Sequence, residues 1–477
     1  MTINSAVNKL SGKRKGERPK VLLIQPPIHD FALYDHYLKP YGLLRLASFF
    51  TQSDWDVEFL DCLDYREPES VDMLNSPRRK ADGSGKFFRT PVENPLKDKP
   101  IPRRFARYGI LPSVMERRIA AAVPDLVLVT SGMTYWYRGV AEAVRRVRKS
   151  YPHIPVAVGG IYASLMPDHC ENVCGADAAI IGDALVASGG RMAVSEPFAS
   201  FLRKSGLPVP ILGSEERLLD TGRPTISPLL LPRVWDSAGI IRMNRGCPFN
   251  CDYCASRRIS EGFHPGDGRD AFESMMAIHH YSGTRNFAFY DDALLYKKGE
   301  LFHPFLRMVI AAQLDFNFYT PNAVHLKYLD GETADLMVRA GFREIRLGYE
   351  SASEEFHRKR DGKFDPASFP GKIETLREAG FSPVDIRVYI LAGLPGQRWE
   401  DVEKSVRFAK KTGVSISLSE YSPVPGSPMW EESCRASVFP LKDEPLYHNN
   451  TFFPMEWEGF TREALEKIKR LTRSKTS

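Results

Sequence analysis

Short apolar runs alternate with amphipathic segments between residues 286 and 421, and this alternation limits the possible folds more than any other feature. The apolar runs have the length of buried strands, and the segments between them repeat apolar residues at helical spacing. Glycine follows three of the predicted helices, where a left-handed residue ends a helix readily. Alternating strands and helices predict a parallel α/β sheet or barrel. Strands are predicted at 286–290, 316–320, 344–349, 385–393 and 415–421, and helices at 301–312, 328–340, 368–379 and 400–411.

Polar residues stand directly after several of these predicted strands. Asp291 and Asp292 follow the first strand, and Asn322 follows the second. Glu350 and Ser351 follow the third. The carboxyl ends of the strands carry the active sites of α/β barrels. We therefore expect these side chains to converge, together with the loop that holds three cysteines before the first of these strands.

Those cysteines, Cys247, Cys251 and Cys254, occupy eight residues in a C-x3-C-x2-C spacing after the apolar run 238–243. Thiolates are soft ligands that suit iron–sulfur clusters. Three thiolates can hold three irons of a four-iron cubane and leave the fourth iron open to a substrate. Structural zinc would need a fourth ligand at a suitable spacing, and a disulfide would leave one thiol over. We favour a cluster that takes part in chemistry over zinc, a disulfide or three unconnected core cysteines.

The string 245–254, including Tyr253 before its last cysteine, resembles the signature of the radical S-adenosylmethionine (SAM) enzymes. The resemblance implies a 4Fe-4S cluster whose open iron is chelated by the amino and carboxylate groups of SAM. In that family the reduced cluster cleaves SAM to methionine and a 5′-deoxyadenosyl radical, which abstracts a hydrogen atom from substrate.

Three later strings, at 290–292, 348–351 and 392–396, resemble strand-end motifs of the same family. The resemblance places Asp291 or Asp292 near the amine of SAM, Glu350 at the ribose or amine, and the turn from Gly393 beside the adenine. Many members carry Gly-Gly-Glu where this chain has Tyr-Asp-Asp, so the partner of the amine stays open. A surface or helix-capping role is the alternative for Asp292 and for Glu350. The SAM-site residues implied are Tyr253, Asp291, Asp292, Glu350, Ser351 and Gly393.

A second series of strands precedes the cysteines and predicts a Rossmann-like, doubly wound α/β domain. Ligands of such sheets sit outside the carboxyl ends of the strands. These strands are predicted at 20–25, 56–61, 125–130, 155–160 and 177–183, with helices at 41–51 and 140–150.

The strand-end strings at 159–167 and 181–183 resemble the cobalamin-binding domain that precedes many radical SAM barrels. The Gly159-Gly160 pair lets the backbone pass close to a flat ligand or its nucleotide tail. Thr130, Ser131 and Thr134 are expected to hydrogen-bond corrin amides or that tail. A Rossmann-like domain without cofactor is the alternative. The predicted cobalamin site consists of Thr130, Ser131, Thr134, Gly159, Gly160, Tyr162 and Gly182.

The loop after the first strand departs from many cobalamin domains, which carry a cobalt-ligating histidine in an Asp-x-His-x-x-Gly motif. His29 and His36 are present, but neither lies in the full motif. The resemblance therefore implies a cobalt without a protein histidine on its lower face. The aromatic residues Tyr135, Trp136 and Tyr137 are expected either to pack near that face or to bridge the two domains.

The length of 477 residues predicts more than one domain. The other cysteines are too few for a second cluster, so Cys170 and Cys174, four apart on a predicted helix, are expected to be buried, and Cys62 and Cys434 structural. We predict a disordered basic N-terminus at 1–19, the cobalamin-binding domain at 20–185 with an irregular insertion at 65–118, a linker at 186–236, a partial (β/α)6 TIM-type radical SAM barrel at 237–430 and a small helical C-terminal tail at 431–477.

The net charge and the composition limit which classes of protein function remain possible. The net charge of +6 is mild for this length, and no nucleic-acid-binding motif, membrane span or secretory signal is evident. Seven cysteines are compatible with a reducing cytoplasm. We predict a cytoplasmic, cobalamin-dependent radical SAM enzyme, most simply a C-methyltransferase. It would use a flavodoxin- or ferredoxin-type electron donor and an unidentified small-molecule or peptide substrate. The alternatives are a radical SAM cyclase or isomerase without cobalamin, and a cofactor-binding sensor or carrier.

Overall fold

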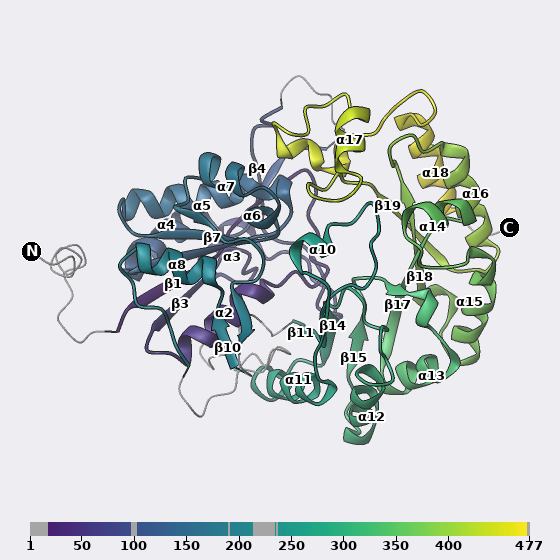
Figure 1. Ribbon diagram of the computed structural model, residues 1–477, viewed down its shortest axis with the longest axis horizontal. Helices are drawn as coiled ribbons and strands as arrows, with labels where there is room; N and C mark the ends of the chain where they lie inside the picture. The colour runs from purple at the N-terminus through teal and green to yellow at the C-terminus, as the bar shows by residue number, and fades with distance from the viewer. Residues whose placement is uncertain (1–17, 97–102, 189–190, 213–233, 235–236, 475–477) are drawn as a thin grey trace, which may run out of the picture. The chain divides into compact units, whose positions relative to one another are not determined.

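The computed structural model describes residues 18–96, 103–188, 191–212, 234 and 237–474 (Figure 1). The chain divides into two compact units, residues 1–236 and 237–477. The predicted disordered N-terminus lies outside the described residues except for its last two positions. Residues 213–233 and 235–236 of the predicted linker also lie outside them.

The first unit contains a parallel five-stranded sheet in the order β3-β1-β6-β7-β8. The interior strand β1 is fully buried from Val21 to Ile24, which explains its uninterrupted apolar sequence. The chain reverses its winding between β1 and β6, so the predicted doubly wound class is confirmed. The strands are β1 (Lys20–Gln25), β3 (Asp56–Asp61), β6 (Leu126–Ser131), β7 (Val156–Gly160) and β8 (Ala178–Ala179), the last much shorter than predicted.

Helices connect these strands and supply one face of the core. Val140, Ala143, Val144 and Val147 share one buried face of α5, as the helical period requires. Pro112 begins α4. Residues 112–118 of the predicted insertion 65–118 are therefore part of the helix that connects β3 and β6. The helices are α2 (Tyr41–Thr51), α4 (Pro112–Ala122), α5 (Tyr137–Ser150), α6 (Ile161–Leu165) and α7 (Pro167–Cys174).

The insertion is more regular than its composition predicts. Its strands β4 (Arg89–Pro91) and β5 (Ala106–Tyr108) form a three-stranded antiparallel sheet with β2 (Ile28–Asp30). A short helix, α3 (Pro68–Leu74), precedes them. This small sheet has its own apolar core, made by Ile28, Leu63, Phe87, Ala106 and Tyr108.

Part of the predicted linker packs as a component of the first unit. The hairpin β9 (Leu185–Ser188) and β10 (Arg191–Val194) is followed by α8 (Glu196–Lys204). The ring of Phe198 lies edge-on to that of Phe50, with ring centroids 6.3 Å apart. Because apolar side chains on α8 must be covered, the chain folds back on α2 before it leaves this unit.

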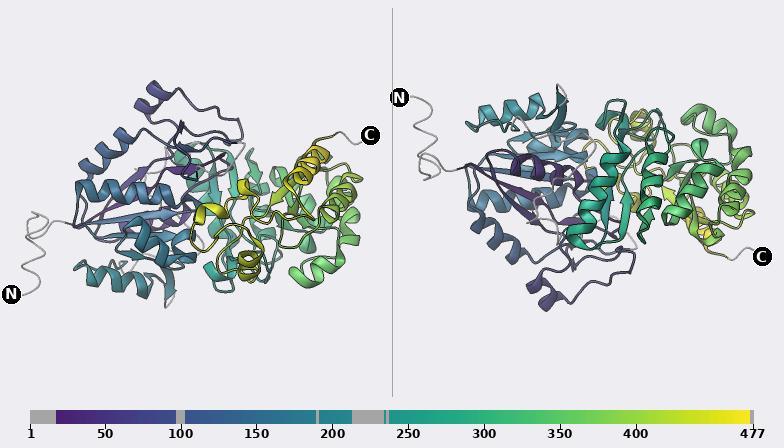
Figure 2. Two further views of the ribbon diagram at one scale, coloured as in Figure 1. Left: turned by 90° about the horizontal axis from the view of Figure 1, so that it is seen from above. Right: turned by 90° about the horizontal axis from the view of Figure 1, so that it is seen from below.

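The second unit contains a seven-stranded parallel sheet, six strands of which follow one another in chain order, with helices covering its outer face (Figures 1 and 2). The strands β11 and β19 are its edges, so the predicted partial (β/α)6 barrel is confirmed. The strands are β11 (Gly239–Ile241), β14 (Asn286–Phe289), β15 (Asn317–Tyr319), β17 (Phe342–Glu350), β18 (Ile386–Ala392) and β19 (Ser415–Glu420), with β16 (Val324–His325) added beside β17. The covering helices are α11 (Gly268–Ser282), α12 (Phe302–Ala312), α13 (Gly331–Ala340), α15 (Phe369–Glu378) and α16 (Trp399–Lys410).

The strands alternate their side chains between the helical layer and the lumen. On β17, Ile345, Leu347 and Tyr349 are fully buried, whereas Glu344, Arg346 and Glu350 are only partly buried on the opposite face. The second set is polar, so the lumen of this barrel is charged rather than filled with aliphatic layers. Side chains on this face of β17 and β18 reach the site described below.

The C-terminal tail belongs to the second unit. The helix α18 (Arg462–Arg473) buries Leu465 and Ile468, and Lys469 on it pairs with Glu420 at 3.0 Å. A shorter helix, α17 (Trp430–Ala436), precedes it. No helix within the described ranges is long and apolar enough to span a membrane.

Candidate cofactor sites

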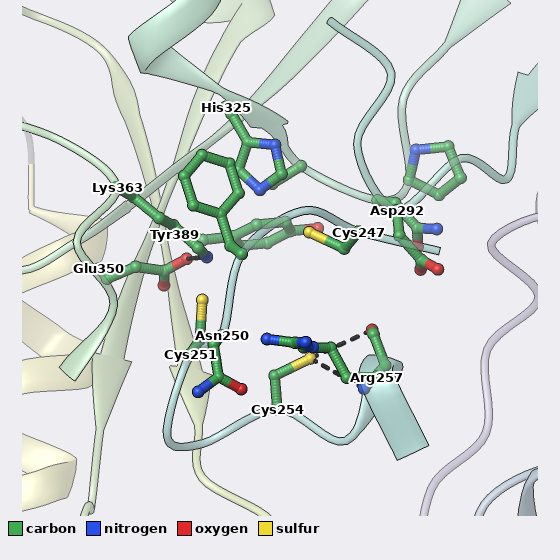
Figure 3. Close-up of a pocket in the computed structure, with 15 residues that line it drawn as sticks. Cys247, Asn250, Cys251, Cys254, Arg257, Asp292, His325, Glu350, Lys363 and Tyr389 are labelled. Carbon is green, nitrogen blue, oxygen red and sulfur yellow. Dashed lines mark hydrogen bonds and ion pairs between the residues drawn. The ribbon is translucent and has the colours of Figure 1, made fainter. Parts of the chain in front are cut away.

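The cysteine loop follows β11 and lies at the carboxyl ends of the barrel strands. Its first part, β12 (Asn244–Gly246), pairs with β13 (Phe263–Pro265), and its last part leads into α10 (Ser256–Ile259). Cys247, Cys251 and Cys254 all line one pocket of about 390 Å³ (Figure 3). Cys247 and Cys251 are buried and Cys254 is exposed, and all three thiols are free.

The pocket is larger than a single-ion site. No three His, Cys, Asp or Glu side chains in the described part of the chain stand close enough to hold one metal ion. The three thiols lie around this pocket (Figure 3), and thiolates are the ligands that iron–sulfur clusters take. The pocket is lined by Cys247, Phe249, Asn250, Cys251, Cys254, Ser256, Arg257, Asp292, Pro321, Asn322, Ala323, His325, Glu350, Lys363 and Tyr389.

Asp291 braces the cysteine loop and does not line the pocket. Its carboxylate is buried and accepts hydrogen bonds from the backbone N–H groups of Met243 (3.0 Å) and Asn244 (2.8 Å). Burial raises the pKa of Asp291 to about 7, against the effect of those two backbone bonds. Because β11 and β14 are parallel neighbours, Asp291, two residues after the end of β14, can reach the chain leaving β11. Of the two acids expected near the amine of SAM, Asp291 has this structural role and Asp292 lines the pocket.

Asp292, Asn322 and Glu350 do line the pocket, from three different strand ends. Burial raises the pKa of Asp292 and of Glu350, and the positive charge of Lys363 opposes that rise for Glu350. Glu350 has a left-handed backbone, with φ of 64°. Such strained conformations of non-glycine residues cost free energy and occur often at functional sites.

Tyr253 faces a polar network behind the pocket. Its hydroxyl donates to Asp361 Oδ2 (2.9 Å) and accepts from Lys363 Nζ (3.1 Å). His357 Nδ1, on α14 (Glu354–Arg360), lies 3.0 Å from Asp361 Oδ1. Burial disfavours the charged form of Lys363, but the neighbouring Glu350 and Cys251 raise the pKa of its ammonium. Tyr253 therefore anchors the cysteine loop to the segment after β17, and the cofactor contact expected of it stays a prediction.

Sequence reasoning missed several residues of this site. Lys363 and Asp361 lie in a polar stretch between a strand and a helix, where no motif marks them. His325 lines the pocket with its Nδ1 unpartnered, and burial lowers its pKa to about 3, so the imidazole is neutral. Tyr389 also lines the pocket, and its hydroxyl accepts a hydrogen bond from Arg346 Nη1 (2.8 Å). The position of Tyr389 on the lumen face of β18 is the one signal in the sequence that could have marked it as a pocket residue.

Ser351 and Gly393 do not line the pocket and have structural contacts, and the cofactor contacts expected of them stay predictions. The Ser351 hydroxyl accepts from Ser353 N (3.1 Å), and its carbonyl lies 2.9 Å from His357 Nε2. Gly393 has φ of 87°, and an added Cβ would lie 2.6 Å from the ring of Phe453. Gly393 therefore makes room for an aromatic side chain of the tail, because that ring packs on the turn.

The carboxyl edge of the first sheet is tied together by short backbone contacts. Ser131 Oγ donates to the carbonyl of Gly159 (2.6 Å) and accepts from Ala163 N (3.2 Å). Gly160 has φ of 96°, and a Cβ there would lie 2.3 Å from the carbonyl oxygen of Ser131. Gly182 N donates to Ser164 Oγ (2.9 Å). Ser131, Gly160 and Gly182 thus shape the edge.

Tyr162 points into the core and away from this edge. It is 0% exposed, and its hydroxyl lies 2.7 Å from His169 Nδ1 and 3.4 Å from Cys174 Sγ. Cys170 and Cys174 are both buried on α7, as predicted. Tyr162 is buried because the second position of α6 faces α7, so nothing in its surroundings supports the predicted cofactor contact.

The same edge presents an open apolar surface. A Cβ at Gly159 would meet nothing within 4 Å. Met133, Ile161 and Ile181, from three successive strand-end loops, are 45%, 37% and 47% exposed. Thr134 is buried at the start of a short 3-10 helix (Thr134–Trp136) in the first of these loops, and Thr130 is half-buried at the end of β6. A flat ligand with a largely apolar face fits this surface.

His29 already has a protein partner. Its Nε2 lies 2.8 Å from Glu142 Oε2, and Arg107 Nε donates to the same carboxylate at 3.0 Å. This buried group joins the small antiparallel sheet to α5. Trp136 Nε1 donates to Asp30 Oδ2 (2.6 Å), which ties the loop after β6 to β2. The imidazole of His29 is therefore held by Glu142 of α5.

Comparison with known families finds a match within each unit. Residues 241–409 match the radical SAM superfamily, and residues 108–188 match the B12 binding domain. The chain thus contains one region similar to the radical SAM superfamily and another similar to the B12 binding domain. The three-cysteine pocket lies at the strand ends of the matched radical SAM domain. The open apolar edge lies in the matched B12-binding domain.

Individual relatives are distant. The chain is 23% identical over 242 residues to an uncharacterized methyltransferase of Pyrococcus horikoshii, covering 50% of this chain and 49% of that protein. It is 23% identical over 269 residues to the anaerobic magnesium-protoporphyrin IX monomethyl ester cyclase of Synechocystis, covering 52% and 53%. The chain thus spans about half the length of these curated relatives.

A solved structure shares the fold over nearly the whole chain. It is the radical SAM methyltransferase TsrM of Kitasatospora setae, with tryptophan substrate and a SAM analogue bound. The TM-score is 0.60 at 16% identity, and the match covers 94% of this chain and 87% of that one.

Proposed function

We propose that this protein is a cobalamin-dependent radical SAM enzyme that transfers a methyl group to carbon. The observation that carries the proposal is the convergence of Cys247, Cys251 and Cys254 on one pocket of the radical SAM domain, in a chain that also has a B12-binding domain. Two relatives named methyltransferases support the reaction class.

The pocket supplies the groups that such a reaction needs. The three cysteine thiolates would hold a 4Fe-4S cluster, and Asp292 and Glu350 offer carboxylates to the ammonium and ribose hydroxyls of SAM. When bound, the cluster and SAM supply a substrate radical, and cobalamin supplies the methyl group. His325 is neutral and cannot repel a cationic ligand, and Tyr389 presents a hydroxyl oriented by Arg346.

The first unit would hold cobalamin at the carboxyl edge of its sheet. Gly159 and the apolar residues Met133, Ile161 and Ile181 would face the corrin ring, and Thr130 and Thr134 would bond its amides or tail. No histidine of the loop after β1 would ligate cobalt, since His29 pairs with Glu142. We further propose a cytoplasmic location and an external low-potential electron donor of flavodoxin or ferredoxin type.

Radical chemistry without methyl transfer is the second candidate, because one relative is named a cyclase. Anaerobic reconstitution with iron, sulfide and hydroxocobalamin, followed by desalting and metal analysis, separates the two. Near-stoichiometric cobalt beside about four irons per chain supports the methyltransferase. A cluster without cobalt supports the second candidate. Absence of a cluster in the wild-type protein would refute both.

A further inference from the structure

Lys363 is a buried cation in the wall of the cysteine pocket. Its side chain is only 13% exposed, and it lines the pocket with all three cysteines (Figure 3). Its Nζ lies 3.7 Å from Glu350 Oε1 and 5.3 Å from the centre of the Tyr253 ring. Lysines are rarely buried unless paired, so this placement requires an explanation.

Several contacts hold this ammonium in place. Lys363 N donates to Asp361 Oδ1 (3.0 Å), and Nζ donates to the Tyr253 hydroxyl (3.1 Å). That hydroxyl in turn donates to Asp361 Oδ2 (2.9 Å). The backbone N–H of Lys363 is therefore bonded directly to the buried Asp361 carboxylate, and its ammonium is linked to the same carboxylate through the Tyr253 hydroxyl. Tyr253 directly precedes Cys254 of the cysteine loop. The charge cannot withdraw into solvent without breaking this network.

The other charges at the pocket are arranged differently. Arg257 also lines the pocket, but its side chain is exposed, so water and salt screen its charge. Glu350 and Asp292 are the two carboxylates of the wall. Lys363 is thus the buried cation that faces the thiols among the described lining residues, and Glu350 offsets part of its charge.

We propose that Lys363 is a positioning residue that raises the reduction potential of the cluster bound by Cys247, Cys251 and Cys254. Reduction adds one electron, from an external low-potential one-electron donor, and breaks no bond to the thiolates. The step adds one negative charge to a partly buried site. A fixed positive charge nearby stabilises the reduced form more than the oxidised form, because Coulomb energy grows with the charge it faces. The inference rests on the proposed function, since it requires that these cysteines bind a cluster.

The test is potentiometric titration of the anaerobically reconstituted full-length protein, followed by electron paramagnetic resonance without SAM. Lys363→Met should lower the midpoint potential, and Lys363→Arg should keep it near the wild-type value. Glu350→Gln should raise it, because the partial neutralisation of Lys363 is removed. Arg257→Met is the matched control, and its shift should be smaller because its charge is screened.

The outcomes separate this inference from the proposed function. Failure of the wild-type protein to bind a cluster would refute the proposed function itself. A full cluster with an unchanged midpoint in Lys363→Met, together with weaker SAM binding by equilibrium dialysis, would show that Lys363 only anchors SAM and would overturn the inference. Should Lys363→Met fail to assemble a cluster, Lys363→Gln decides. A midpoint below the wild-type value supports the inference, and an unchanged one overturns it.

Discussion

The two parallel sheets of this protein end in differently built edges, although both carry glycines and polar residues there. At the barrel edge, charged side chains from separate strand ends meet in one pocket and are held by a buried network around Tyr253, Asp361 and Lys363. At the edge of the first sheet, Ser131 and Gly160 tie the loops together through the backbone, and apolar side chains remain exposed. The first arrangement suits chemistry on charged species, and the second suits holding a large flat ligand.

The largest expected effect is the loss of the cluster, and it concerns the barrel edge alone. Cys251→Ala removes one of three cluster ligands, so bound iron and SAM cleavage should fall to background. Cobalamin binding by the first unit should be unchanged. Iron analysis and cobalt analysis of the same sample measure both. Cys434→Ala, at a partly exposed cysteine of the tail outside the pocket, is the control and should retain its iron. Equal loss of iron in both variants would contradict the assignment.

Substitutions of the adjacent residues Asp291 and Asp292 test whether the first supports the cysteine loop while the second only lines the pocket. Asp291→Ala leaves two buried backbone N–H groups without an acceptor and should cost about 3 kcal/mol of unfolding free energy. Asp292→Ala should change that free energy by less than about 1 kcal/mol, because no backbone group among the described residues depends on it. Denaturant titration of both variants measures the difference. Equal destabilisation would show that Asp291 is not a brace.

The pH dependence of the unfolding free energy also tests the structural role of Asp291. The folded-state pKa of Asp291, about 7, lies above its unfolded value of 3.8. Its contribution favours the fold fully below pH 3.8 and is lost as pH rises through about 7. Between these values the wild-type free energy of unfolding should fall relative to that of Asp291→Asn, which cannot ionise. A parallel pH profile for the two proteins would contradict this.

The glycine pair of the first edge separates folding from ligand binding. Gly160→Ala forces a side chain into a left-handed residue and against the Ser131 carbonyl, so it should cost about 2 kcal/mol. Gly159→Ala meets open space and should change stability by about 0.5 kcal/mol or less. Gly159→Ala should nevertheless weaken cobalamin binding, because the new methyl group occupies the ligand surface. Spectrophotometric titration with hydroxocobalamin tests this, and unaltered binding would place the corrin elsewhere.

The smallest expected effect concerns Tyr162. Tyr162→Phe removes the hydrogen bond to His169 and should cost about 1 kcal/mol. Cobalamin binding should be unaffected, since the side chain is buried in the core. Thermal unfolding and the same cobalt titration measure the two quantities. Weaker cobalamin binding at unchanged stability would restore Tyr162 to the ligand edge.

The repeating elements were predictable because their signals are local. The apolar period of α5 and the continuous apolar run of β1 each reflect what one element must bury. The insertion was predicted poorly, because β2, β4 and β5 are three residues each and are stable only when paired. Cys247, Cys251 and Cys254 were predictable as a group because their ligand spacing lies within one loop.

The choice between neighbouring residues was not predictable. Asp291 and Asp292 are identical in type, and only the pleat of β14 and the position of β11 turn one to the backbone and the other to the pocket. Ser351 and Gly393 lie in segments that resemble family motifs. Their contacts, however, are with His357 of α14 and Phe453 of the tail, which lie outside those motifs.

The sequence by itself determined the succession of strands and helices, the cysteine spacing and the missing histidine motif, because each depends on residues close together in the chain. Only the tertiary structure decided which polar side chains face the pocket. Lys363 and Tyr253 are 110 residues apart in sequence, and their hydrogen bond exists because parallel strands bring distant loops to one edge. A buried charge is defined by such distant partners, so its role emerges when the barrel is assembled.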